Sequence, residues 1–70
     1  MKIDFAAKVK GLRKWSGLTG KDFAAIIGVG YIQLTRIERG VQSITTDKIQ
    51  KLTEYFGISL ETFISMNFDA

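Results

Sequence analysis

The sequence predicts an all-α fold, a compact five-helix bundle, and three observations lead to this class. The chain has 70 residues, of which 46% are hydrophobic and none is proline, a composition that favours helices packed around a small core. Apolar residues recur three and four positions apart in several short segments. Glycines and hydroxyl-bearing residues separate these segments, where helices are expected to end and begin. We therefore expect a single domain that covers residues 1–70.

The first helix is predicted to run from about Ile3 to Trp15, and Gly17 is placed to end it. Positions i, i+4 and i+7 of this segment are apolar and form one inward stripe. The residues of that stripe are Phe5, Val9 and Leu12.

A second helix is expected to start at Thr19. Thr19 is a predicted N-cap, and Asp22 lies three residues later, where its carboxylate can return the hydrogen bond of a capping box. Leu18 and Phe23 have the spacing of a hydrophobic staple. Gly28 suits the left-handed position that ends such a helix.

The third helix is expected at about residues 30–39, with Leu34 and Ile37 inward and Gly40 at its end. Together with the preceding helix it forms two short amphipathic segments joined by a glycine-bounded turn. This arrangement over about residues 19–39 is typical of a helix-turn-helix, in which the second helix enters the major groove of DNA.

Two more helices complete the bundle. Thr45 or Thr46 is predicted to cap a fourth helix that reaches Tyr55 and ends at Gly57. Its inward residues are Ile49, Leu52 and Phe56. Ser59 is predicted to cap a fifth helix from Leu60 to about Met66, with Ile58 and Phe63 as a second staple.

The outward face of the third helix is the candidate functional surface. At about 100° per residue, the side opposite its apolar stripe carries Ile32, Thr35, Arg36 and Arg39, with Tyr31 on the flank. Arg36 can pair with guanine O6 and N7, Thr35 with a base edge or a phosphate, and Ile32 with a thymine methyl. An ordinary solvated face is the alternative, but isoleucine gains nothing from exposure to water.

The charge is unevenly distributed along the chain. The formal net charge is +3, but residues 1–21 hold six basic residues and one acid, a balance of +5, whereas residues 41–70 balance at −2. This pattern predicts attraction of a polyanion to the N-terminal part, weakening as salt rises. Membrane binding is not expected, because the lysines of the first helix are interspersed with core residues and no broad aromatic face accompanies them.

Composition also argues against an enzyme. The chain has neither cysteine nor histidine, which removes thiol nucleophiles, disulfides, the usual zinc ligands and imidazole chemistry. The seven acidic residues are scattered singly, without the pairing that acid-base catalysis needs. We expect no active site, metal, cofactor or ligand pocket. The N-terminus lacks the apolar core of a signal peptide or membrane span, so a cytoplasmic location is expected.

A set of short motifs extends from Phe5 to Ile64. They are Leu12-Arg13, Gly17-Leu18-Thr19, Phe23-Ala24, Ile27-Gly28-Val29, Arg36-Ile37-Glu38-Arg39-Gly40, Leu52, and Phe56-Gly57-Ile58-Ser59-Leu60. Together they resemble the lambda-repressor/Cro-like (Xre-type) helix-turn-helix family of phage repressors, plasmid regulators and antitoxins.

The resemblance implies a compact five-helix domain whose third helix lies in the major groove, and a structural ion pair between Arg13 and Glu38. Two positions depart from the family. Gly20 stands where family members often carry a DNA-contacting glutamine, although backbone N–H groups there can still hold a phosphate. Gly30, Tyr31 and Ile32 replace a serine cap and polar base-reading residues.

The expected function is a sequence-specific DNA-binding transcriptional regulator, a repressor, acting as a homodimer on two half-sites. The residues expected to hold phosphates are Thr19, Gly20, Lys21, Gln42 and Ser43. The alternative is a protein-interaction module, an antitoxin or adaptor, in which Tyr31 and Ile32 dock a toxin or another regulator.

Four large apolar residues have open assignments. Tyr55, Met66 and Phe68 either form a dimer or partner surface or fold back on the core. Trp15 lies off the stripe of the first helix and is expected to cover an edge of the core, with contact to a partner or to a sugar-phosphate backbone as alternatives.

Overall fold

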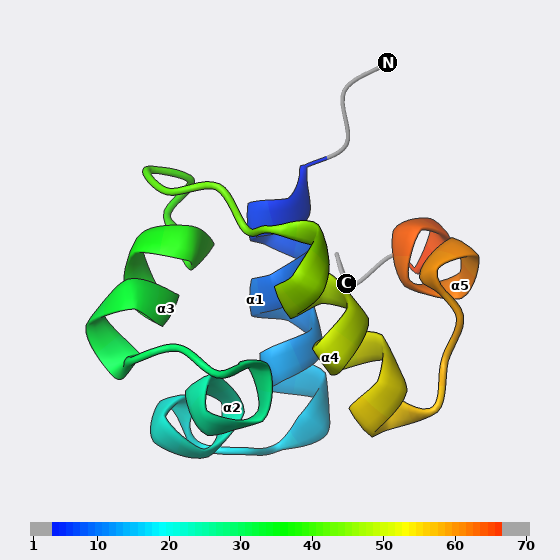
Figure 1. Cartoon of the computed structure of the whole chain (residues 1–70), viewed down its shortest axis with the longest axis horizontal. Coiled ribbons are helices and arrows are strands. Elements are labelled where there is room, and N and C mark those ends of the chain that lie inside the picture. The colour runs from blue at the N-terminus through cyan, green and yellow to red at the C-terminus, as the bar shows by residue number, and fades with distance from the viewer. Residues whose placement is uncertain (1–3, 67–70) are drawn as a thin grey trace.

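The computed structural model describes residues 4–66, which form five α-helices and no strand within that range. The helices are α1 (Phe5–Ser16), α2 (Gly20–Ile27), α3 (Tyr31–Glu38), α4 (Thr46–Phe56) and α5 (Leu60–Ser65). The predicted all-α class and each predicted helix are confirmed. In Figure 1, α3 and α5 lie on opposite sides of α1 and α4, with α2 beneath α3. α3 packs against α1 and α2, α2 also packs against α4, and α4 against α5.

The helix starts follow the predicted N-caps. The hydroxyls of Thr19, Thr45 and Ser59 each accept a hydrogen bond from the backbone N–H three residues later, at 3.1, 3.4 and 3.0 Å. Thr45, and not Thr46, is therefore the cap of α4. Asp4 caps α1 by accepting from the Ala7 N–H at 3.1 Å, so α1 begins two residues later than predicted.

One detail of the α2 start differs from prediction. Thr19 accepts from the Asp22 N–H, but the hydrogen bonds within residues 4–66 do not include one that the Thr19 N–H donates to the Asp22 carboxylate. Aspartate is one methylene shorter than the glutamate that usually completes a capping box. Only half of the predicted capping box forms.

The turn between α2 and α3 depends on Gly28. Gly28 ends α2 in the left-handed conformation with φ 77°, which a residue with a Cβ rarely adopts. The following N–H, of Val29, donates to the Ala24 carbonyl at 3.0 Å. The chain therefore leaves α2 sharply and α3 begins three residues later.

The core is formed by the predicted inward residues. The buried apolar side chains are Val9, Leu12, Phe23, Ala24, Ile27, Leu34, Ile37, Ile49, Leu52 and Phe63. Phe5 and Phe56 are half-buried at its edge, where Phe5 stacks on Phe63 with ring centres 6.4 Å apart. Leu18 and Ile58 also pack against the core, consistent with both predicted staples. This core holds α3 with one face outward.

Candidate nucleic-acid interface

α3 has a buried face and an open face. Leu34 and Ile37 are buried, whereas Ile32 is 67% exposed and Tyr31 is 52% exposed. Arg36 and Arg39 are exposed as well. The structure therefore brings four of the five predicted base-reading residues to the surface of α3 and its C-cap, Arg39, with two cations and two large apolar groups among them.

Thr35, the fifth of these residues, is half-buried. Its hydroxyl donates a hydrogen bond to the Ile32 carbonyl, with 2.6 Å between the oxygens. Because the hydroxyl proton is used within the helix, the Thr35 oxygen is left to act as an acceptor.

A two-pronged ion pair fixes α3 against α1. Arg13 Nε lies 2.7 Å from Glu38 Oε2, and Arg13 Nη2 lies 3.0 Å from Glu38 Oε1. The side chains are 25% and 9% exposed, so water reaches the carboxylate poorly. The hydrogen bond to Glu38 is the main cause that raises the pKa of Arg13; burial opposes this, and the negative charge of the Glu38 carboxylate adds to it. Glu38 thus serves the scaffold, as the resemblance implied.

The start of α2 meets the start of α3. Thr19 is occupied as the N-cap of α2, Lys21 is exposed, and the ring of Tyr31 lies over Gly20. The predicted phosphate-binding residues 19–21 are therefore next to the first turn of α3.

The other two predicted phosphate-binding residues lie beyond the opposite end of α3. Gln42 is half-buried and Ser43 is exposed, both in the connector from α3 to α4. The five residues of this predicted set consequently flank α3 at both ends, and Figure 1 shows α2 and the connector at opposite ends of α3.

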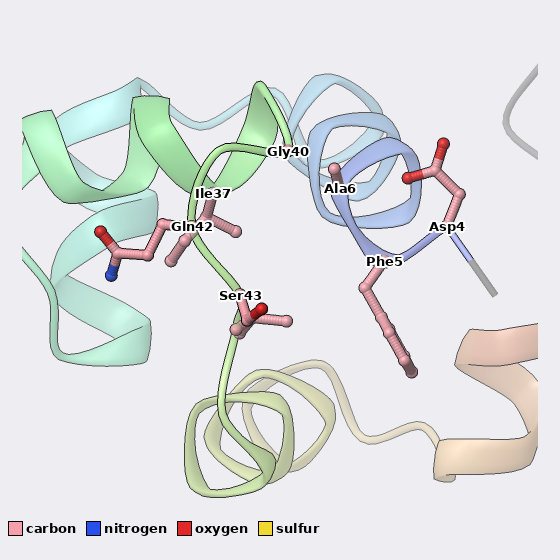
Figure 2. A pocket seen from close by; sticks show the side chains of 8 residues that line it. Asp4, Phe5, Ala6, Ile37, Gly40, Gln42 and Ser43 are labelled. Atoms are coloured by element: carbon pink, nitrogen blue, oxygen red, sulfur yellow. The ribbon is translucent and has the colours of Figure 1, made fainter. Parts of the chain in front are cut away.

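A surface hollow of about 400 Å³ lies beside the connector. Figure 2 shows Asp4 and Phe5 of the α1 end on one side of it, and Gln42 and Ser43 on the other. The expectation of no ligand pocket stays a prediction, because a hollow open to solvent does not by itself show that a ligand binds. That expectation considered spare volume inside the core, whereas this hollow lies between two elements at the surface.

Part of the predicted basic surface is engaged within the fold. The Lys8 ammonium donates to the Met66 carbonyl at 2.7 Å, and Arg13 is held by Glu38. Lys10, Lys14 and Lys21 are exposed. Glu38, which lies outside residues 1–21, therefore offsets the charge of Arg13, whereas Lys8 keeps its charge and only the position of its ammonium is fixed.

Sequence reasoning missed two residues. Gln33 is exposed in the first turn of α3, and a carboxamide there can pair with adenine. On the helical wheel Gln33 lies beside the apolar stripe, so the predicted outward face did not include it. Lys48 donates to the Gly28 carbonyl at 3.3 Å, which places a cation at the C-terminus of α2, where the helix dipole favours it.

The four large apolar residues with open assignments differ in their exposure. Trp15 is 67% exposed, so the expectation that it covers the core edge was wrong; its place in the last turn of α1 turns it outward. Tyr55 is exposed and Met66 half-buried. Phe68 lies outside the described residues.

Between residues 4 and 66, no helix is long and apolar enough to cross a bilayer. The same range brings together no group of three or more acidic, histidine or cysteine side chains suited to a metal.

Comparison with known proteins places this geometry in context. Residues 9–63 match a family described as helix-turn-helix. The chain is 37% identical over 51 residues to the antitoxin PezA of Streptococcus pneumoniae serotype 4, a match that covers 73% of this chain and 32% of the antitoxin. It is 36% identical over 58 residues to the glutamine–fructose-6-phosphate aminotransferase (isomerizing) of Methanocaldococcus jannaschii, covering 81% of this chain and 5% of that enzyme. No solved structure gives a significant match.

The chain thus spans about a third of one curated relative and a twentieth of the other. A match to so small a part of the aminotransferase carries none of that enzyme's activity to this chain.

Proposed function

The chain belongs to the helix-turn-helix family, and on that premise we propose that it is a sequence-specific, double-stranded DNA-binding transcriptional regulator that acts as a repressor. In this proposal α3 enters the major groove. The observation that carries it is the open face of α3, where Ile32, Arg36 and Arg39 are exposed while Leu34 and Ile37 hold the helix to the core.

The side chains of α3 divide the work of recognition. Arg36 pairs with a guanine edge, Arg39 reaches a base or phosphate farther along, and Ile32 with Tyr31 contacts apolar parts of the groove. Thr35 accepts a hydrogen bond, since its own proton is given to the Ile32 carbonyl.

Phosphates are held on both sides of α3. Thr19, Gly20 and Lys21 lie at the start of α2, and Gln42 and Ser43 lie in the connector. Contacts at both ends of the recognition helix would fix its register along the duplex without reading sequence.

The regulator acts as a homodimer on two half-sites about one helical turn apart. Tyr55, Met66 and Phe68 are the proposed dimer or partner surface, and the exposure of Tyr55 supports this assignment. Sedimentation of the protein with and without bound duplex measures the assembly state directly.

A gel-shift series tests DNA binding. Fragments of the genome that encodes the chain are bound at two salt concentrations, and competition with random duplex measures specificity. If about four phosphates are neutralised, affinity falls roughly a hundredfold between about 50 and 200 mM salt. Affinity that does not depend on salt, or that random duplex matches, contradicts the proposal.

A pair of lysine variants provides the matched control. Lys21→Gln is expected to reduce the salt slope by about one. Lys51→Gln makes the same charge change near Gly28, at the opposite end of α2 from Gly20, and is expected to leave the slope unchanged. Equal slopes for the two variants would remove Lys21 from the phosphate-binding set.

The second candidate function is an antitoxin or adaptor that binds a protein. It is favoured by the similarity to the antitoxin PezA and by the exposed Tyr31 and Ile32. An apolar contact of this kind depends weakly on salt. Salt-independent binding of a toxin, lost in Ile32→Asp, would favour this function over DNA recognition.

A further inference from the structure

The first residues of α2 and α3 are in unusually close contact. A Cβ built on Gly20 would overlap Cε1 of Tyr31, and it would lie 3.0 Å from Cδ1 and 3.5 Å from Cζ. One edge of the Tyr31 ring therefore rests directly on the Gly20 backbone. Any side chain at position 20 would collide with the ring as it is placed.

The backbone does not otherwise require glycine at position 20. The glycines with positive φ among residues 4–66 are Gly17, Gly28, Gly40 and Gly57, so Gly20 has a conformation open to any residue. Glycine is also a poor helix former at the start of α2. The property of glycine that matters at position 20 is the space that it leaves for the Tyr31 ring.

The other glycines at helix ends show that such packing is not general. Apart from each glycine's two chain neighbours, a Cβ built on Gly17, Gly28, Gly30, Gly40 or Gly57 comes no nearer than 3.2 Å to another residue. Among these glycines, only Gly20 would bring a Cβ into overlap with a side chain.

The seated ring shares an end of α3 with another apolar group. About half of Tyr31 stays exposed, and Ile32 beside it is two-thirds exposed. The ring is consequently bounded on one side by the α2 backbone at Gly20.

We propose that Gly20 is a positioning residue that seats the Tyr31 ring, so that Tyr31 and Ile32 present one fixed apolar edge that recognises thymine methyl groups in duplex DNA. The missing side chain at position 20 and the large ring at position 31 act as one unit. The inference rests on the proposed DNA-binding function for its ligand, but the seat itself is testable without DNA.

Thermal unfolding tests the seat through a double-mutant cycle. In the Tyr31→Ala background, Gly20→Ala removes only a flexible glycine and is expected to raise the melting temperature by roughly 2 to 6 °C. In the parent protein, which keeps Tyr31, Gly20→Ala also displaces the ring, so the rise in melting temperature is expected to be smaller or to become a fall. The same gain in both backgrounds would overturn the seat.

Thymine-to-uracil exchange in a bound duplex tests the readout, because it removes only the methyl group. The parent protein is expected to lose about fourfold in affinity for each contacted methyl. Gly20→Ala and Tyr31→Ala should lose this discrimination, whereas Tyr31→Phe keeps the ring and should retain it.

The outcomes separate the two proposals. If no duplex is bound, the proposed function fails while the unfolding cycle still decides the seat. If a duplex is bound with no preference for thymine, or if Gly20→Ala keeps the parent's preference, the methyl-reading edge is wrong and DNA binding stands.

Discussion

α2 and α3 are equal in length, at eight residues each, but they are held in place by different means. α2 has a side-chain N-cap from Thr19, a left-handed glycine at its end, and three buried residues. α3 begins at Gly30 with no side-chain cap and buries only Leu34 and Ile37. An ion pair from α1 supplies the additional hold on α3.

The difference shows how a short helix can be both fixed and available to a ligand. α2 is stabilised by residues within and next to it, and its inner face is committed to the core while Lys21 stays exposed. α3 is held at its inner face and near its C-terminus by Ile37 and Glu38, which leaves its first turn exposed. Tyr31 and Ile32 are then free to meet a partner.

The largest expected effect comes from breaking α2. Phe23 is fully buried, and Phe23→Ala removes its ring from the core at a cost of about 3 to 5 kcal/mol. A domain of this size has little stability beyond that. Urea unfolding followed by circular dichroism should therefore find the variant largely unfolded.

The matched control is Ile32→Ala on α3. Because Ile32 is exposed, its loss should change the free energy of unfolding by no more than about 0.5 kcal/mol. If both variants lose comparable stability, the distinction between the two helices does not hold.

The next largest effect comes from releasing α3. Arg13→Met leaves the Glu38 carboxylate, which is 9% exposed, without its partner and should cost about 3 kcal/mol in the free energy of unfolding. Replacing both residues, as Arg13→Met with Glu38→Leu, removes the unpaired charge and should recover much of that loss. A double variant that is no more stable than Arg13→Met would mean that the uncompensated charge is not the cause.

A smaller effect is expected for Arg36, and it concerns DNA affinity and not the stability of the fold. Arg36→Ala should weaken binding to a specific duplex by about 1 to 3 kcal/mol and relax the preference at one base pair. Arg36 is exposed, so the melting temperature should stay unchanged. Fluorescence anisotropy with specific and random duplexes measures both affinities; an unchanged ratio would assign Arg36 to another role.

The smallest effects are expected from substitutions at the N-caps of α2 and α3. Thr19→Ala removes the hydroxyl that accepts from the Asp22 N–H and should cost about 1 kcal/mol. Gly30→Ser supplies α3 with the cap it lacks and should stabilise by a few tenths of a kcal/mol. Chemical unfolding measures whether the free energy of unfolding falls in Thr19→Ala and rises in Gly30→Ser, each compared with the parent. A lower free energy of unfolding for Gly30→Ser would show that its hydroxyl does not reach the α3 N–H groups.

Features that depend on nearby residues were predictable from the sequence, and contacts between distant residues were not. The N-caps and inward stripes were predicted because each depends on residues within one or two turns. Trp15 was misplaced because its distance from the stripe does not tell which neighbours reach it. The hydrogen bond from Lys8 was not predicted because its partner, the Met66 carbonyl, lies 58 residues away.

By itself the sequence determined the helices, their caps and the residues that face the core, since periodicity and capping act over short distances along the chain. The three-dimensional packing decided that Arg13 and Glu38 meet in a two-pronged pair, that the Tyr31 ring rests on Gly20, and that a hollow opens beside the connector. These features join residues that are distant in sequence. Their contacts depend on how helices cross, and no local pattern specifies the crossing.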